Sequence, residues 1–189
     1  MANLLTYIFA KVYVHSLAAA SLGGFGFQTC TLSQFLIGSL AFVGVMSYEE
    51  KNIKVLPEDT DVFGRLNWRV YCRYCEQGEA GLMENLGFPP MYFHKMYKIS
   101  FPRRAAHFEY FSPVSPDNLI ELKTEIEKIG TTSLTLLHTF YKKRRTDGNP
   151  MLVAKAKVTI VAYDDRLHDK TELPRKLLKT LNALGIRKK

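Results

Sequence analysis

Carboxylates are concentrated in one short stretch of the sequence, directly before a long amphipathic segment. Glu58, Asp59 and Asp61 lie within four residues, and Gly64 follows. Grouped carboxylates repel one another, so stability alone explains them poorly. They either lie in a solvated turn, as we expect for Glu58 and Asp59, or one of them is held at a helix start. A carboxylate held there lies beside N–H groups without intrahelical partners. It can attack a carbonyl carbon or take a proton, while those amides stabilise the developing oxyanion.

Other residues with reactive side chains lack the spacing that their chemistry needs. Cys72 and Cys75 form a C-x-x-C pair, but no second ligand pair for zinc accompanies them, and they fall inside a predicted helix rather than at a strand-to-helix junction. We expect packed helix residues and neither a metal nor a redox cofactor. Three histidines in strand-like or connecting segments lack metal-ligand spacing and predict structural roles: His94, His107 and His138. Glu76 and Glu79 form either an acid/base pair or a polar helix edge.

Length and composition indicate a globular protein with one ordinary domain. The chain has 189 residues, of which 47% are hydrophobic and 23% charged, with a formal net charge of +8. A basic surface favours nucleic acid, anionic lipid or phosphorylated small molecules as partners. No nucleic-acid-binding motif accompanies the charge, so we expect no nucleic-acid partner. The few cysteines point to a reducing compartment, and we expect a cytoplasmic protein.

The first 45 residues form an apolar leader in which Lys11 is the only charged side chain. A signal peptide lacks support because no positive charge precedes the apolar run. A membrane anchor over Thr31–Met46 is slightly short for a bilayer, although membrane association remains the alternative location. We favour Met46 as the natural start. The sequence therefore predicts a leader (1–45), a domain (46–170) and a basic C-terminal helix and tail (171–189).

The domain begins with a predicted strand over 51–57 and a helix that Asn67 caps and Gly87 ends. Small residues inside this helix indicate that something packs very close to it; they are Gly78, Ala80 and Gly81. One face of the helix is expected to be buried through Trp68, Tyr71, Cys75, Gly78, Leu82 and Leu86.

The rest of the chain is predicted to be mainly strands. They span 98–111, 119–129, 132–142 and 151–163, with a hairpin connection at "KKRRTDGNP" and a closing helix over 173–184. A sheet that follows one long helix must bury the apolar stripe of that helix. The expected class is therefore α+β, with an antiparallel sheet wrapped around one long central helix.

Three segments resemble one family. They are "EDTDVFGRLNWRVYCRYCEQG" (58–78), "FSPVSPDNLIELKTEIEKIGTTS" (111–133) and "PMLVAKAKVTIVAYD" (150–164). In this order they are similar to hotdog-fold acyl-CoA thioesterases of the 4-hydroxybenzoyl-CoA type, in particular the short-chain enzymes associated with the Tol–Pal system. The resemblance covers roughly 51–165 and implies a single hotdog fold.

The resemblance implies that Asp61 hydrolyses an acyl-CoA or acyl-carrier-protein thioester as nucleophile or general base. Trp68 stands where the Tol–Pal-associated enzymes carry a histidine, and Pro57 where they carry a tyrosine. Without the resemblance, Asp61 is better explained as a turn or capping residue. Candidates for oxyanion or substrate binding are Gly64, Asn67, Trp68, Tyr71 and Glu76.

The resemblance also concerns partners. Family members place the active site between two subunits, which implies a homodimer or homotetramer. Basic residues near strand ends hold the nucleotide of coenzyme A in the family, so the candidates are Ser133, Lys142, Lys143, Arg144 and Lys155. A solvated hairpin tip explains the basic run equally well. The alternative function is a non-catalytic acyl-thioester-binding or assembly protein on the same fold, with Trp68 filling the site.

Overall fold

The computed structural model describes residues 47–143 and 149–186. All of them belong to the unit Val43–Lys189. The predicted leader, the hairpin tip at 144–148 and residues 187–189 lie outside the described residues. In the described part of the chain, no helix is long and apolar enough to cross a membrane.

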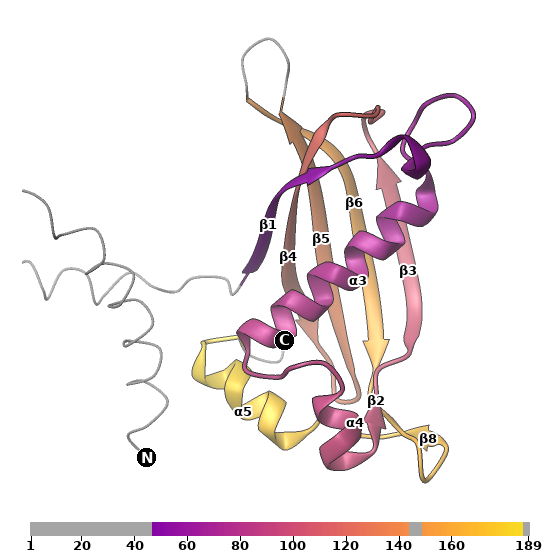
Figure 1. The fold of residues 1–189 in the computed structure, drawn as a ribbon. Helices are drawn as coiled ribbons and strands as arrows, with labels where there is room; N and C mark the ends of the chain where they lie inside the picture. The colour runs from indigo at the N-terminus through magenta and orange to yellow at the C-terminus, as the bar shows by residue number, and fades with distance from the viewer. Residues whose placement is uncertain (1–46, 144–148, 187–189) are drawn as a thin grey trace, which may run out of the picture. The chain divides into compact units, whose positions relative to one another are not determined.

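A five-stranded antiparallel sheet wraps around one long helix, α3 (Figure 1). In spatial order its strands are β1 (Ser47–Lys54), β4 (Leu119–Ile129), β5 (Ser133–Lys143), β6 (Pro150–Val161) and β3 (Arg103–Tyr110). Helix α3 spans Trp68–Asn85, after a short 3-10 helix, η1 (Pro57–Asp59). The predicted α+β arrangement is confirmed.

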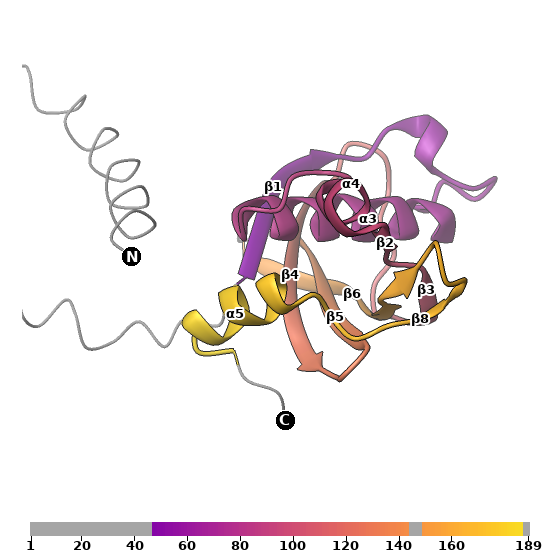
Figure 2. The same cartoon turned by 90° about the horizontal axis from the view of Figure 1, so that it is seen from below.

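Smaller elements cover one end of the sheet (Figure 2). They are α4 (Tyr92–Tyr97), α5 (Arg175–Ala183) and the three short strands β2 (Ile99–Ser100), β7 (Tyr163–Asp164) and β8 (Asp169–Lys170). Helix α5 inserts Leu177 and Leu181 into the core. Lys176 Nζ donates a hydrogen bond to Tyr92 Oη at 2.6 Å and thereby joins α5 to α4.

Strand burial follows the alternation that the sequence predicts. On β4, Ile120, Leu122 and Ile126 are buried, while the charged side chains between them form pairs such as that of Glu121 with Lys143 of β5 at 3.8 Å. One face of the sheet therefore packs on α3 and the other faces water. Strand β3, at the sheet edge, is the exception, because all but one of its residues are exposed.

Helix α3 has the predicted ends. The Asn67 side chain accepts a hydrogen bond from the Arg69 N–H at 3.1 Å, and Gly87 adopts φ +83° just past the last turn. Tyr71 and Leu82 are buried as predicted. Trp68 was expected on the same face, which is wrong: it is 63% exposed, because the helix begins there, beyond the cover of the sheet.

Two glycines let the sheet approach α3 closely, as predicted. A Cβ atom added to Gly78 would lie 2.2 Å from Thr124 Oγ1, and one added to Gly81 would lie 2.3 Å from the Tyr48 ring. Ala80 points away from this contact and is exposed. The glycines therefore set the distance between helix and sheet.

His138 lies in the core beside this contact, fully buried. Its Nδ1 shares a hydrogen bond with Thr124 Oγ1 at 3.0 Å, and its Nε2 has no partner among the described residues. Burial, with a smaller contribution from Arg103, lowers the pKa of His138 to about 4. The imidazole is therefore neutral at physiological pH, in keeping with a structural role.

Helix α4 was not predicted. The sequence predicted a strand from residue 98 and no element for the residues that form α4. The structure closes this six-residue helix between Met91 and Lys98, both in the left-handed region. Strand β1 also begins at Ser47 rather than at residue 51, because Ser47 pairs with Glu125 of β4.

Replacing Gly78 with alanine tests the helix–sheet contact. The added methyl group cannot fit beside Thr124, so we expect Gly78→Ala to lower the free energy of unfolding by about 2–3 kcal/mol. Denaturant unfolding measures the change. Gln77→Ala, on the exposed side of the same helix, should change stability little. Equal stability of both variants would contradict the contact.

The buried histidine predicts a pH dependence of stability. The pKa of His138 is lower in the folded state than the ordinary 6.5 of the unfolded chain. The unfolded chain therefore takes up a proton first as pH falls. Between pH 6.5 and 4 the free energy of unfolding should fall by about 3 kcal/mol from this group. His138→Leu should lack this part of the pH dependence, measured by urea unfolding across that range. Parallel pH curves would refute the assignment.

Candidate active site

Asp61 begins a tight turn that fixes its carboxylate. Oδ1 accepts hydrogen bonds from the Phe63 N–H at 2.9 Å and the Arg65 N–H at 3.0 Å. The Asp61 N–H donates to the Arg65 carbonyl at 2.7 Å. Gly64 adopts φ +68° inside the turn, a conformation that favours glycine. Among the described residues Oδ2 has no hydrogen-bond partner, so it is the oxygen available for chemistry.

Asp59 holds this turn to the helix. It was expected to be solvated, which is wrong: it is 5% exposed and pairs with Arg73 Nη2 at 2.6 Å. Its carbonyl also accepts from the Asn67 N–H at 2.9 Å. Arg73 lies one and a half turns into α3, so the ion pair fastens the turn to the helix start. Glu58 is exposed, as predicted.

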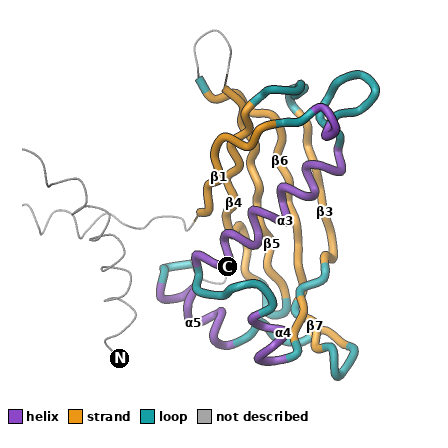
Figure 3. The backbone as a smooth tube through the Cα atoms, in the orientation of Figure 1, coloured by secondary structure: helices purple, strands orange, loops and turns teal. Residues whose placement is uncertain are grey.

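A groove opens beside Asp61, with a volume of about 570 Å³. Its lining residues come mainly from the loop before α3 and the loop after β3, and both loops lie at the same end of the sheet (Figure 3). Of the residues predicted for the site, it is lined by Asp61, Asn67, Trp68 and Tyr71. Residues 110–114 form the opposite wall. We call this cavity the Asp61 groove.

The start of α3 offers a free amide to the groove. The Leu66 and Asn67 N–H groups donate to the Val114 and Asp59 carbonyls, and the Asn67 side chain takes the Arg69 N–H. In the part of the chain that the structure describes, the Trp68 N–H has no acceptor. A free N–H at a helix start can hydrogen-bond an oxyanion.

Tyr71 forms the floor of the groove. Its ring packs edge-on against Tyr110 and Phe140, each with ring centroids 5.2 Å apart. Burial raises the pKa of Tyr71 well above its ordinary value. Tyr71 therefore stays protonated and serves as an apolar wall with a hydroxyl donor.

Glu76 lies in the middle of α3, outside the Asp61 groove. It borders a second cavity of about 480 Å³ between α3, α4 and the first residues of β3, which we call the α4 cavity. Arg103 Nη2 lies 3.6 Å from Glu76 Oε1 and 3.0 Å from Glu79 Oε2. The expected grouping of Glu76 with Asp61 does not occur within one chain.

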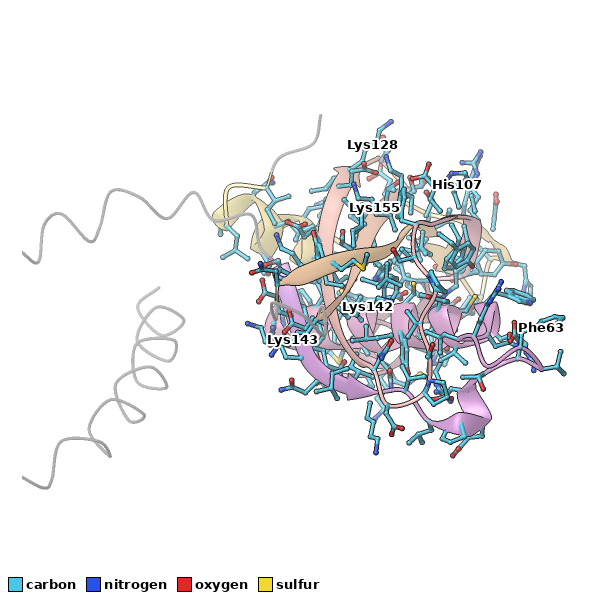
Figure 4. All side chains as sticks on the ribbon, turned by 90° about the horizontal axis from the view of Figure 1, so that it is seen from above. Phe63, His107, Lys128, Lys142, Lys143 and Lys155 are labelled. Carbon is cyan, nitrogen blue, oxygen red and sulfur yellow. The ribbon has the colours of Figure 1, made fainter. Side chains whose placement is uncertain are left out.

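The coenzyme A candidates are dispersed. Lys142 reaches the loop after β3, where its Nζ donates to the Pro113 carbonyl. Lys143 lies 3.8 Å from Glu121, and Lys155 lies on the sheet face away from α3 (Figure 4). Ser133 opens β5 at the far end of the sheet. Arg144 lies outside the described residues, so Lys142 alone of these residues is placed next to the groove.

Sequence reasoning missed several residues at the groove. Arg65 lines it, and Phe63 projects from the tip of the Asp61 turn, 79% exposed (Figure 4). Tyr110 and Phe111 are about half exposed on its other wall. The sequence signal that could have identified Tyr110 and Phe111 is that they form an aromatic pair directly before the "SPVSPD" turn. No group of metal-ligating side chains occurs within 47–143 and 149–186.

Solved structures of other proteins share the fold of this chain. The 4-hydroxybenzoyl-CoA thioesterase of Pseudomonas sp. strain CBS-3 superposes with a TM-score of 0.64 at 18% identity, over 71% of this chain and 99% of that one. A Staphylococcus aureus protein in complex with CoA gives a TM-score of 0.62 at 13% identity, over 76% of this chain and 85% of that one. These likenesses confirm the predicted hotdog fold.

Sequence comparison reaches the same group of proteins. The acyl-CoA thioester hydrolase YbgC of Escherichia coli is 24% identical over 126 residues, which cover 67% of this chain and 90% of YbgC. The family model of the thioesterase-like superfamily matches residues 55–181, a range that contains the Asp61 turn, α3, the main sheet from β4 to β3 and most of α5. On this match the chain belongs to the thioesterase-like superfamily.

Proposed function

We propose that the chain hydrolyses acyl-CoA thioesters in the Asp61 groove. The observation that carries the proposal is the fixed Asp61 carboxylate, which lines the same groove as Trp68. Among the described residues one oxygen of this carboxylate is free, and the Trp68 N–H at the start of α3 is unpaired. The names of YbgC and of the Pseudomonas enzyme, both thioester hydrolases, support the reaction class.

The geometry suits attack on a thioester carbonyl. The two amide hydrogen bonds to Oδ1 hold the Asp61 carboxylate, which lines the groove, in one orientation, so that little reorganisation precedes the reaction. Oδ2 then attacks the carbonyl carbon, or removes a proton from the water that does. In either case the carbonyl oxygen gains negative charge, which the Trp68 N–H and the positive end of the α3 dipole stabilise. The thiolate of coenzyme A then leaves and takes up a proton. If Oδ2 attacked, a water molecule hydrolyses the acyl–Asp61 anhydride and regenerates the carboxylate; if Oδ2 acted as base, the free acid forms directly.

The rim of the groove suits the phosphates of coenzyme A. Arg65 lines the groove, and Lys142 is anchored on the Pro113 carbonyl at its edge. Lys142 keeps further N–H donors free for a phosphate oxygen. Acyl-carrier protein offers the same pantetheine thioester on an acidic surface and is the alternative carrier. The cytoplasmic location expected from the sequence stays a prediction.

We propose that the active form is a homodimer paired through β3. Among the described residues this strand forms an edge of the sheet with its outer side unpaired, and such edges pair readily with another strand. Exposed aromatic side chains continue the surface beside it: Phe63 at 79%, Trp68 at 63% and Phe111 at 52%. A second copy would cover both the edge and these rings.

The molar mass of the protein in solution tests the proposed homodimer. Multi-angle light scattering should give at least twice the chain mass of 21.6 kDa at micromolar concentration. A mass equal to one chain would rule out the stable homodimer.

Asp61→Asn tests the proposed reaction. The asparagine oxygen can still accept from the Phe63 and Arg65 amides, so the turn should persist while the free carboxylate oxygen is lost. We expect kcat to fall by about 100-fold or more. Hydrolysis of short, long and aromatic acyl-CoAs should be followed by mass spectrometry, since Cys72 and Cys75 can react with thiol dyes.

Glu58→Gln serves as the matched control, because it removes an exposed carboxylate three residues away and should leave kcat unchanged. Undiminished turnover in well-folded Asp61→Asn would refute the role of Asp61. Tight binding of coenzyme A without turnover by the unmodified chain would favour the acyl-thioester-binding alternative, in which Trp68 occupies the site.

A further inference from the structure

Helix α4, helix α5 and the β7–β8 hairpin are joined to one another at one end of the sheet (Figure 2). The Asp165 N–H of the hairpin donates to the carbonyl of Lys98, the residue after α4, at 2.9 Å. The hydrogen bond described above between a lysine of α5 and a tyrosine of α4 joins the two helices. Residues 91–98 and 163–186 therefore hold fixed positions relative to one another, and we call their exposed surface the basic end.

The surplus positive charge of the described residues lies at the basic end. Its two segments hold seven Lys and Arg residues and four Asp and Glu residues, whereas the other described residues hold thirteen of each kind. All seven basic side chains are exposed. Three further basic residues, Arg187, Lys188 and Lys189, follow in the sequence and lie outside the described residues. An anionic partner is therefore attracted to this end of the molecule.

Large apolar side chains are exposed among these basic residues. Leu167 at the hairpin tip is 73% exposed, Met96 of α4 is 62% exposed, and Tyr97 beside it is 38% exposed. Single exposed apolar residues are ordinary on a protein surface, but a rigid turn presents Leu167. The buried carboxylate of Asp164 pairs with the Arg166 guanidinium at 2.6 Å and accepts the Arg166 N–H at 2.9 Å. The turn therefore keeps Leu167 exposed, where burial by a partner is favourable.

Basic side chains around exposed aliphatic ones suit the surface of an anionic membrane. Lys and Arg side chains stay among the lipid phosphates, aliphatic side chains enter the boundary with the acyl chains, and a tyrosine ring suits the headgroup level. The hairpin tip projects from this end of the domain (Figure 1), as insertion requires. A nucleic acid is less suited, because Leu167 and Met96 offer no plane on which bases stack.

We propose that the basic end binds the surface of an anionic membrane, with Leu167 and Met96 entering the lipid and the surrounding Lys and Arg side chains contacting lipid phosphates. The Asp61 groove lies at the opposite end of the sheet (Figure 3). Binding to a membrane therefore leaves the groove accessible to acyl-CoA. This inference does not depend on the proposed reaction.

Vesicle sedimentation with the full chain tests the contribution of charge. We expect the chain to bind mixed phosphatidylcholine–phosphatidylglycerol vesicles far more strongly than pure phosphatidylcholine vesicles. Lys95→Gln combined with Lys179→Gln removes two exposed charges from the basic end and should weaken binding at least about 10-fold. Lys51→Gln combined with Lys54→Gln removes the same charge from β1 and should weaken binding less than about 2-fold. Equal losses in the two pairs, or no binding by the unmodified chain, would overturn the inference.

Removing the apolar side chains tests insertion into the lipid. Leu167→Ser combined with Met96→Gln keeps every charge and should weaken binding at least about 10-fold, because both side chains lose their burial in lipid. Val62→Ser, at a residue that is 94% exposed in the Asp61 turn, is the control and should bind like the unmodified chain. Unchanged affinity in the Leu167/Met96 pair, with the Lys95/Lys179 pair weakened, would overturn the membrane and favour an acidic protein surface as the partner.

Fluorescence locates the side chain that enters the lipid. The emission of Leu167→Trp should shift to shorter wavelength when mixed vesicles are added, because the indole leaves water. Val62→Trp, at the opposite end of the sheet, should show no shift beyond that of the unmodified chain. The same shift in both variants, or none in Leu167→Trp, would place the membrane elsewhere and refute the assignment.

The outcomes separate this inference from the leader and from the proposed function. Residues 1–45 carry a single charged side chain, and binding through them would not respond to these substitutions. Vesicle binding that all the variants retain would therefore overturn the inference. Asp61→Asn should bind vesicles like the unmodified chain. The Lys95/Lys179 pair lies outside the Asp61 groove and should hydrolyse acyl-CoA in solution with unchanged kcat.

Discussion

The close approach of α3 to the sheet at Gly78 is the constraint on which the rest of the structure depends. With no Cβ there, Thr124 and His138 of the sheet pack directly against the helix. That contact fixes where the first turn of α3 lies relative to β3, since helix and sheet are both rigid. The Asp59–Arg73 ion pair then attaches the Asp61 turn to this helix. A side chain at residue 78 would push α3 away from the sheet and widen the groove between Trp68 and Tyr110.

The two cavities follow from one geometric fact, which is that α3 crosses the sheet obliquely. It begins near the last residues of β3 and runs toward β1 (Figure 1), and the Arg103 side chain, from the first residue of β3, reaches the middle of the helix. Tyr71, packed between helix and strand, divides the space into two parts. One part holds a fixed carboxylate and a free amide, and the other an apolar chamber with a charged entrance. Within one chain the two parts are therefore separate.

The sequence predicted the parts of the fold that local patterns determine. Alternation over Leu119–Ile129, the Asn67 cap and the small residues at 78 and 81 each carry their own signal. Helix α4 escaped prediction because its aromatic residues also suit a strand, and because left-handed residues at Met91 and Lys98 have no local signature. Asp59 was misjudged because its partner, Arg73, lies fourteen residues away. The separation of Glu76 from Asp61 depends on tertiary packing, which residue spacing does not contain.

A crystal structure of the full chain with a non-hydrolysable ketone analogue of benzoyl-CoA tests the central claim most directly. A methylene group between sulfur and carbonyl keeps the reacting carbonyl in place without a bond to break. The account predicts the carbonyl carbon next to Asp61 Oδ2 and its oxygen within hydrogen-bond distance of the Trp68 N–H. A carbonyl bound away from Asp61 would contradict the account.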